Sequence, residues 1–349
     1  TYVVAIDDII RKHLRALFSD KPTTKAYAFK ITRDAELHLN DELAGSLTSR
    51  MEKQLAKRDF GLATRFLYDA EMPDPMLKKL ISNFKLQDAT TVEGGRYHNL
   101  KDLISFPLKN EKFSYPVQKP TTINTGKDGS VFNMINDQDI MLHTPYHNYD
   151  LVLRFFNEAA IDPSVEKINI TLYRIANDSG IAQALITAAR NGKKVIVMVE
   201  LKARFDEANN IRWAKKMKEA GVDIYYSNTK LKVHAKVALV RKRVEGKVKS
   251  YGLLSTGNFN ESTARFYTDH ILFTADQKIL QDVQTVFTIL TTRKNPLEVK
   301  KVQFQKLIVA PFNIRDRFFE LIDREIANAA KGEKAGITIK QCFAGRPTG

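Results

Sequence analysis

The sequence predicts an α/β (α+β) protein of 349 residues, in which a smaller mixed α+β domain precedes a larger mixed-sheet domain. Three observations predict this. Short β-prone and helical runs alternate over the first hundred residues, a Lys-, Pro- and Gly-rich stretch then interrupts regular structure, and a clear βαβαβ pattern follows. The expected division is a first domain at 1–105, a linker at 106–130, a main domain at 131–300 and a further segment at 301–349.

The first domain carries two expected strand–helix regions. Ala26 to Ile31 and Ala35 to Leu39 are β-prone runs around three polar residues and suggest a hairpin, and Leu43 to Arg58 then has helical composition. A second strand–helix pair is expected at Thr64 to Tyr68 and Pro75 to Phe84.

The main domain shows the clearer pattern. Val195 to Leu201 is nearly continuous apolar sequence, as expected for a strand buried on both faces, and Asp206 can cap the helix that follows it. The remaining expected elements are helices at Leu151 to Ala160, Ile181 to Arg190 and up to Gly221, and strands at Ile168 to Ile175, Val222 to Tyr226, Lys232 to Val240, Ser250 to Leu254 and His270 to Thr274.

Composition narrows the function classes. Lys and Arg number 55 against 40 Asp and Glu, so the net charge of +15 favours polyanionic partners such as phosphorylated substrates, nucleic acid or acidic membranes. A solvated basic surface without a ligand is the alternative on charge alone. The single cysteine, Cys342, favours a reducing compartment, and we expect a cytoplasmic protein with no transmembrane segment and no secretory signal.

Two arginines follow expected strand ends about one βαβ unit apart. Arg174 and Arg204 lie at or beyond the carboxyl ends of successive strands, where ligands collect in open α/β sheets. A guanidinium presents a donor fork that suits phosphate oxygens. Either arginine alone could equally form an ordinary surface ion pair.

The segment Lys230 to Val240 offers a candidate nucleophile. A period of two places Lys232, His234 and Lys236 on one strand face, with His234 and Lys236 roughly 6 to 7 Å apart. Neutral imidazole can attack phosphorus while the lysine offsets charge on the phosphate oxygens. A lone histidine on a strand is more often structural, and the neighbouring lysines weaken that alternative without reversing it.

A Thr-Gly-Asn turn follows the histidine strand and its hairpin partner. Gly257 permits close backbone approach, and Asn258 can bond phosphate oxygens or orient His234. Beyond the turn, Arg265 offers an anion contact, Tyr267 an aromatic face for a nucleotide base, and Asp269 a carboxylate partner for an imidazole. Each of these residues has a structural alternative.

Together these motifs resemble the phospholipase D-like HxK superfamily, and polyphosphate kinase in particular. The core of the resemblance is His234-Ala235-Lys236 followed by Gly257-Asn258-Phe259-Asn260. Further matching stretches are His143 to His147, Ile170 to Arg174, Asn191 to Lys193, Val199 to Glu207, Ser255 to Glu261 and Tyr267 to Asp269, with looser likeness at Asp7 to Ile10 and Asp323 to Ala329.

The resemblance implies reversible transfer of the terminal phosphate of ATP onto inorganic polyphosphate through a phosphohistidine. By position, His234 resembles the phosphorylated nucleophile, Lys236 its charge-stabilising neighbour and Tyr267 a nucleotide contact. Arg174 and Arg204 match arginines of the magnesium and phosphate site. Because arginine has no acceptor atom, we expect them to hold the phosphates that carry Mg²⁺ rather than to ligate the ion.

The resemblance also implies a phospholipase D-like fold for 131–300, the family's middle domain at 1–105, and a truncated second catalytic domain at 301–349. ATP or ADP and polyphosphate are the expected partners, without specific nucleic acid, and the full-length protein is expected to be a homo-oligomer. On this resemblance we expect the chain to be a fragment without the family's N-terminal helical domain. The family's second histidine motif does not follow Lys236, and the tail from Gln341 to Gly349 no longer resembles the family.

Two alternatives stay open for the chain. A phospholipase D-like phosphodiesterase or nuclease would use the same histidine against a diester, and an inactive fragment would only bind polyanions. The pair Arg174 and Arg204 favours a highly charged phosphate chain over a singly charged diester.

Overall fold

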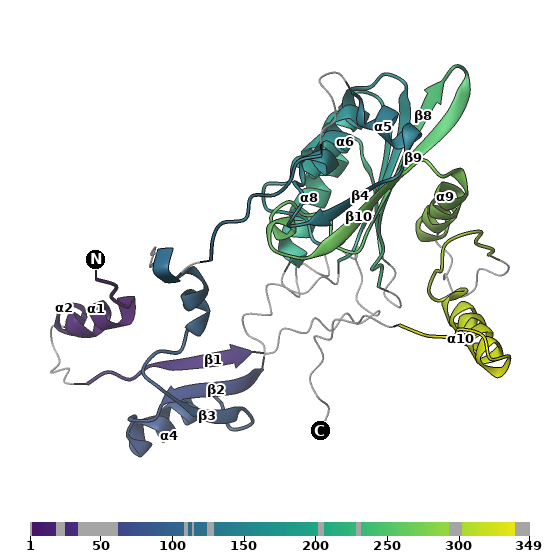
Figure 1. The fold of residues 1–349 in the computed structure, drawn as a ribbon. Coiled ribbons are helices and arrows are strands. Elements are labelled where there is room, and N and C mark those ends of the chain that lie inside the picture. Colours follow the sequence, from purple (N-terminus) through teal and green to yellow (C-terminus); the bar gives the residue numbers. More distant parts are fainter. Residues whose placement is uncertain are drawn as a thin grey trace. The chain divides into compact units, whose positions relative to one another are not determined.

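The computed structural model describes residues 2–18, 25–33, 62–107, 111–113, 115–123, 129–201, 206–227, 232–292 and 302–338. It divides into two compact units, Thr1–Gln118 and Lys119–Gly349, and each unit contains its own β-sheet (Figure 1). The predicted α/β class, with a mixed-sheet domain after a smaller α+β domain, is confirmed.

The first unit is built on a three-stranded sheet of order β1-β2-β3. Strand β2 pairs antiparallel with β1 and parallel with β3, and Phe66 on β2 packs with Leu86 and Ala89 in a small core. The elements are α1 (Ile6–Lys12), α2 (Leu14–Leu17), β1 (Phe29–Arg33), β2 (Ala63–Asp69), α4 (Asp74–Asn83), β3 (Thr90–Gly94) and the 3-10 helices η1 (Leu100–Ser105) and η2 (Glu111–Phe113).

Strand β2 and helix α4 confirm the strand–helix pair expected after residue 62. Strand β1 confirms the first β-prone run, and the partner that the structure describes for it is β2. The other half of the expected hairpin, Ala35 to Leu39, and the expected helix from Leu43 to Arg58 lie outside the described residues.

The second unit contains a seven-stranded sheet of order β4-β10-β9-β8-β5-β6-β7. Strands β5, β6 and β7 are parallel, whereas β8 pairs antiparallel with β5 and joins them to the antiparallel strands β9, β10 and β4. The strands are β4 (Ile140–Thr144), β5 (Val165–Leu172), β6 (Lys194–Val199), β7 (Asp223–Tyr226), β8 (Lys236–Val244), β9 (Lys247–Ser255) and β10 (Asp269–Thr274).

Helices cover both faces of this sheet. Phe132 of α5 contacts Tyr251 of β9, and α6 to α8 continue that layer, while α9 packs on the other face against Val237 and Leu239 of β8 (Figure 1). The helices are α5 (Val131–Asp137), α6 (Asp150–Ile161), α7 (Gly180–Arg190), α8 (Glu207–Glu219), α9 (Gln277–Thr291) and α10 (Ile314–Ala330), with the 3-10 turn η3 (Thr263–Arg265). Burial on two faces explains why the apolar run in β6 is buried from Val195 to Val199, as predicted.

All the predicted strands of this sheet differ from their predicted bounds by one or more residues, and in β5 and β8 one end is displaced because side chains replace ladder hydrogen bonds. Strand β5 ends at Leu172 rather than Ile175, since Asn210 bonds the Tyr173 carbonyl oxygen and the Ile175 amide. Strand β8 begins at Lys236 rather than Lys232, since the side chains of Glu200 and Thr171 hold the backbone before it. Side-chain competition of this kind is invisible to a periodicity argument.

Within the described ranges, no helix combines the length and the apolar character that a bilayer crossing requires.

We predict that Gly252→Ala destabilises the second unit. A Cβ at Gly252 would lie 2.3 Å from Cδ2 of Leu280, which is buried on α9, and 3.1 Å from the carbonyl oxygen of Ala238, so the Leu280 side chain must move within the core. We expect the free energy of unfolding to fall by about 1–3 kcal/mol in urea denaturation.

Gly336→Ala is the matched control, because a Cβ there meets nothing within 4 Å. Equal unfolding midpoints for Gly252→Ala and Gly336→Ala would contradict the close packing of α9 on β9.

Candidate active site

The candidate nucleophile lies on an extended segment that leads into a central strand. His234 is exposed and precedes β8, whereas Lys236 is the first residue of β8 and is only 5% exposed. The predicted outward position is therefore wrong for Lys236, which is buried. Ala235, predicted to lie on the buried face, is exposed because it precedes the part of the strand that is covered on both faces.

One tyrosine joins the imidazole and the ammonium group. The ring of Tyr173 meets the His234 ring edge to face at 5.1 Å, and the Lys236 Nζ lies 5.1 Å from the centroid of the same ring. The Lys236 Nζ also donates a hydrogen bond to the backbone carbonyl oxygen of His234, at 2.6 Å. The nucleophile candidate and the buried cation thus form one contiguous unit.

This environment lowers the pKa of both groups. Burial, followed by the charges of Lys236 and Lys232, lowers the His234 pKa below its ordinary value of 6.5, while the Glu200 charge opposes this shift. Burial lowers the Lys236 pKa to about 8, against the opposing charge of Asp269 and with a further lowering from Arg174. At neutral pH the imidazole is therefore mostly uncharged and nucleophilic, and the lysine remains mostly cationic.

Arg174 follows β5 and lies close enough to Lys236 to influence its pKa. Its Nε is 3.0 Å from Oδ2 of Asp206, and Asn260 donates a hydrogen bond to its carbonyl oxygen. Asp206 does precede α8, but its side chain makes no capping hydrogen bond, so the predicted cap is wrong because the carboxylate pairs with Arg174 instead. Arg204 lies outside the described residues.

The turn after β9 contacts the carboxylate of Asp269, the first residue of β10, which lies near Lys236. Thr256 donates a 2.8 Å hydrogen bond to Oδ1 of Asp269, and a Cβ at Gly257 would lie 2.1 Å from Oδ2 of the same group. Only glycine fits beneath this carboxylate. Asp269 raises the pKa of Lys236, and its predicted partnership with an imidazole stays a prediction.

The remaining predicted site residues lie on neighbouring loops. Asn258 has a buried Oδ1 without a hydrogen-bond partner in the described structure. Tyr267 is 54% exposed, its ring lies 4.8 Å from that of Phe266, and Thr144 donates to its carbonyl oxygen. Among the described residues, neither side chain shares a hydrogen bond or a ring contact with His234.

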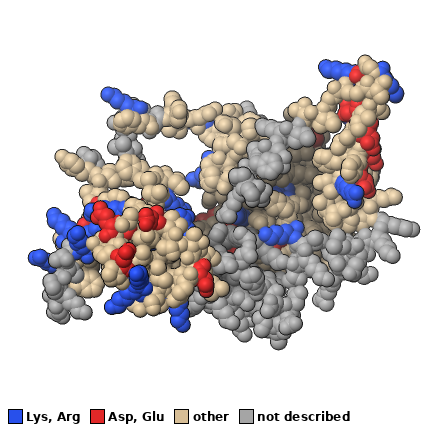
Figure 2. Space-filling model, turned by 90° about the horizontal axis from the view of Figure 1, so that it is seen from below, with Lys and Arg blue, Asp and Glu red and all other residues tan. Residues whose placement is uncertain are grey.

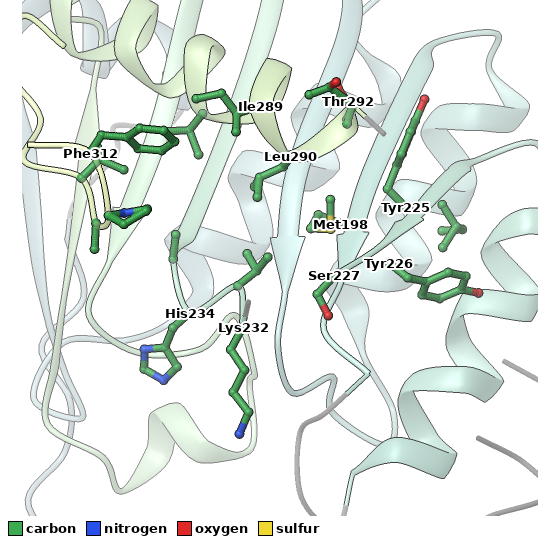
Figure 3. Close-up of a pocket in the computed structure, with 18 residues that line it drawn as sticks. Met198, Tyr225, Tyr226, Ser227, Lys232, His234, Ile289, Leu290, Thr292 and Phe312 are labelled. Carbon is green, nitrogen blue, oxygen red and sulfur yellow. The ribbon is translucent and has the colours of Figure 1, made fainter. Parts of the chain in front are cut away.

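An apolar cavity of about 570 Å³ adjoins His234 on the side of β6, β7 and α9. Figure 3 shows Ile289, Leu290 and Phe312 along the wall contributed by α9 and the segment after it, with His234 and Lys232 projecting from the opposite loop. His234 therefore lines this cavity and also contacts the ring of Tyr173.

On the face that Figure 2 displays, the charges of the described residues are mixed in sign. Figure 2 shows Lys and Arg side chains scattered among Asp and Glu side chains on the face that it displays. The net charge of +15 therefore does not by itself mark a site, whereas the grouping of Arg174, Lys232, His234 and Lys236 does.

Over the described ranges, no three His, Cys, Asp or Glu side chains are grouped as metal ligands. The guanidinium and ammonium groups near His234 suit phosphate oxygens.

Sequence reasoning missed three residues of this site. Tyr173 carries the ring between His234 and Lys236, Thr171 donates to the Ala235 carbonyl oxygen at 2.7 Å, and Glu200 accepts from the Val233 amide at 2.8 Å. Of the three, Glu200 could have been found from the sequence, because it is a single carboxylate in the otherwise apolar run from Val195 to Leu201.

We predict that Asp269→Asn lowers the Lys236 pKa below its value of about 8. Removing the negative charge removes the interaction that favours the ammonium form, so the lysine loses its proton at lower pH. The measurement is an NMR titration of the Lys236 side chain.

Asp223→Asn removes a carboxylate that pairs with Lys194 at the far edge of the sheet, and it serves as the control. An upward shift in Asp269→Asn, or equal shifts in both variants, would contradict the placement of Asp269 beside Lys236.

Comparison with known proteins finds related families, sequences and structures. The protein-family model of the polyphosphate kinase middle domain matches residues 1–106. The family model of polyphosphate kinase C-terminal domain 1 matches residues 130–296. Polyphosphate kinases of Vibrio cholerae and Escherichia coli K12 are each 41% identical to the chain, over 346 and 348 residues, which is 97% of this chain in both cases.

A solved structure of this kind is similar as well. The polyphosphate kinase of Porphyromonas gingivalis superposes with a TM-score of 0.72 at 36% identity, covering 94% of this chain and 47% of that protein. The chain spans about half the length of the curated relatives it matches, 48% for the Vibrio cholerae protein and 50% for the Escherichia coli protein. The chain belongs to the polyphosphate kinase family.

Proposed function

We propose that this chain carries the nucleophile of a polyphosphate kinase, which transfers the terminal phosphate of ATP reversibly to inorganic polyphosphate through a phosphohistidine at His234. The observation that carries this proposal is an exposed imidazole of lowered pKa whose backbone carbonyl accepts a hydrogen bond from a buried lysine. Family membership supports the choice of substrates, since the relatives are named polyphosphate kinases.

The first half of the proposed reaction is attack by neutral His234 on the terminal phosphorus of ATP. A nitrogen–phosphorus bond forms, the bond between that phosphorus and the bridging oxygen breaks, and ADP leaves with the electron pair. In the second half, a terminal oxygen of polyphosphate attacks the same phosphorus, the nitrogen–phosphorus bond breaks and the imidazole is restored. The first half needs an uncharged imidazole as the nucleophile, which the lowered pKa of His234 supports.

Lys236 is proposed to balance charge on the transferring phosphate. Its ammonium group has a fixed place between the Tyr173 ring and the His234 carbonyl oxygen, so it needs no reorganisation when charge develops. Partial burial strengthens its interaction with phosphate oxygens relative to an exposed lysine.

The surrounding groups are proposed to bind the phosphates and the nucleotide. Arg174 and Asn258 would bind phosphate oxygens, Arg204 would join them, and Tyr267 would present its exposed ring to the base. The unpartnered Oδ1 of Asn258 is compatible with an Asn that orients a donor in the complex. Mg²⁺ bound to the ATP phosphates would neutralise part of their charge.

A phosphodiesterase and a purely polyanion-binding protein make different predictions. The former releases a phosphomonoester and an alcohol without ATP. The latter binds polyphosphate with a steep salt dependence that survives loss of His234. The kinase requires ATP-dependent labelling of one histidine.

We predict that incubation with γ-labelled ATP and Mg²⁺ labels His234 in a form that is labile to acid and stable to base. His234→Asn keeps a similar side-chain volume but has no nucleophilic nitrogen, so labelling should fall at least about 100-fold. The measurement is filter-bound radioactivity, followed by identification of the phosphorylated peptide.

His98→Asn, in the first unit, is the control for loss of an imidazole, because that ring contacts the Gly95 carbonyl oxygen and no site residue. Label that persists at full level in His234→Asn would remove His234 from the nucleophile's role.

We also predict a bell-shaped pH dependence of the labelling rate. The acidic limb follows protonation of His234, whose pKa lies below 6.5, and the basic limb follows deprotonation of Lys236 near its pKa of about 8. Lys236→Arg should move the basic limb beyond the measurable range, since arginine stays charged.

Rapid-quench labelling from pH 5 to 10 measures both limbs. A basic limb that stays near pH 8 in Lys236→Arg would show that another group controls it.

A further inference from the structure

Glu200 is a buried carboxylate that the proposed reaction does not use. It directly follows β6 and is 1% exposed. One carboxylate oxygen accepts a hydrogen bond from the Ser227 hydroxyl and the other from the Val233 backbone amide, both at 2.8 Å. A buried carboxylate is strongly unfavourable unless such donors compensate for its lost hydration.

The position of the two donors gives this carboxylate a specific consequence. Ser227 follows β7, and Val233 is the residue before His234, so Glu200 connects the ends of β6 and β7 to the nucleophile's backbone. Strand β8 begins only at Lys236, and the Val233 amide is therefore held by this side chain instead of by a ladder hydrogen bond. Figure 3 shows Ser227, Lys232 and His234 on the adjoining loops.

A second side chain holds the segment on the other side of His234. Thr171 on β5 donates to the Ala235 carbonyl oxygen and accepts from the Val237 amide at 3.1 Å. The backbone around His234 is thus fixed at residue 233 by Glu200 and at residues 235 and 237 by Thr171. Thr171 is neutral, so it holds the backbone without an electrostatic effect on His234. Glu200 both holds the backbone and places a negative charge near the imidazole.

The charge of Glu200 acts on the imidazole. The groups that influence the pKa of His234 are Lys236 on β8 and Lys232 on the preceding loop, which lower it, and Glu200 after β6, which raises it. The ring of Tyr173 also packs on His234 but is neutral at physiological pH. Within the described site, Glu200 is therefore the negative charge that opposes two lysines and the burial of the imidazole.

We propose that Glu200 is a positioning residue for the nucleophile, which fixes the backbone at Val233 and supplies the buried negative charge that balances the two lysines flanking His234. The inference rests on the proposed role of His234, but the geometry it concerns can be measured without turnover.

Two substitutions separate the two contributions. Glu200→Gln can still accept from the Val233 amide through its oxygen and can donate to the Ser227 hydroxyl through its nitrogen, so it removes the charge and keeps the hydrogen bonds. Glu200→Ala removes both. Asp282→Asn is the matched control, because Asp282 is a buried carboxylate on α9 that holds the backbone amides of residues 305–307.

The first measurement is the NMR titration of the His234 ring in the whole chain, with His234→Asn to assign the resonance. Glu200→Gln should move the midpoint to lower pH by about half a unit, since it removes the charge that favours the imidazolium. Asp282→Asn should leave it unchanged. An unchanged midpoint in Glu200→Gln would overturn the electrostatic part of the proposal.

The second measurement is hydrogen exchange at the Val233 amide. Exchange should accelerate by about tenfold or more in Glu200→Ala and stay near the unsubstituted rate in Glu200→Gln. Unchanged exchange in Glu200→Ala, in a chain that still shows native resonances, would overturn the positioning part.

Labelling with γ-labelled ATP then tests the link to catalysis. Glu200→Ala should lose about tenfold to a hundredfold in rate, with partial rescue in Glu200→Gln. Full-rate labelling in Glu200→Ala would overturn the proposal. Absence of labelling in the unsubstituted chain would instead count against the proposed kinase activity, and the titration and exchange results would still decide the role of Glu200.

Discussion

The site depends on the burial of Lys236 at the point where β8 enters the sheet. An ammonium group withdrawn from water needs compensation, and here it comes from the face of Tyr173, the carbonyl oxygen of His234 and the charge of Asp269. The hydrogen bond to that carbonyl oxygen joins the cation to the backbone of the proposed nucleophile. The contacts that position Lys236 therefore also position the imidazole of His234.

The charges around these two residues are arranged as a balanced set. Arg174 and Lys232 add positive charge, and Asp206, Glu200 and Asp269 each oppose one part of it. Because the carboxylates pair with side chains or backbone amides, the cations keep their places in the absence of a phosphate ligand. Such preorganisation is the main way in which a protein can assist phosphoryl transfer, where little covalent chemistry is left to side chains.

The parallel part of the second unit could be predicted from the sequence, because β6 is a continuous apolar run between amphipathic helices, whereas β4, α5, α9 and α10 were not predicted. The bounds were wrong where polar side chains replace ladder hydrogen bonds, as Asn210 does after Leu172 and Glu200 does before Lys236. The residue types of the site were predicted from spacing and family likeness. Its geometry could not be, since the contacts of Tyr173 and Glu200 join residues far apart in the chain and depend on strand order.

The strand order affects how the site forms during folding. Thr171 contacts Ala235, which lies 64 residues further along the chain. This is because β8 pairs with one edge of β5, whereas β6 and β7, which come between them in the sequence, lie on the other edge. Proteins rich in contacts of such long range fold slowly. In a partly unfolded chain, His234 would lack the ring of Tyr173 and the hydrogen bonds by which Thr171 holds its flanking backbone, so the ordered site would form together with the sheet.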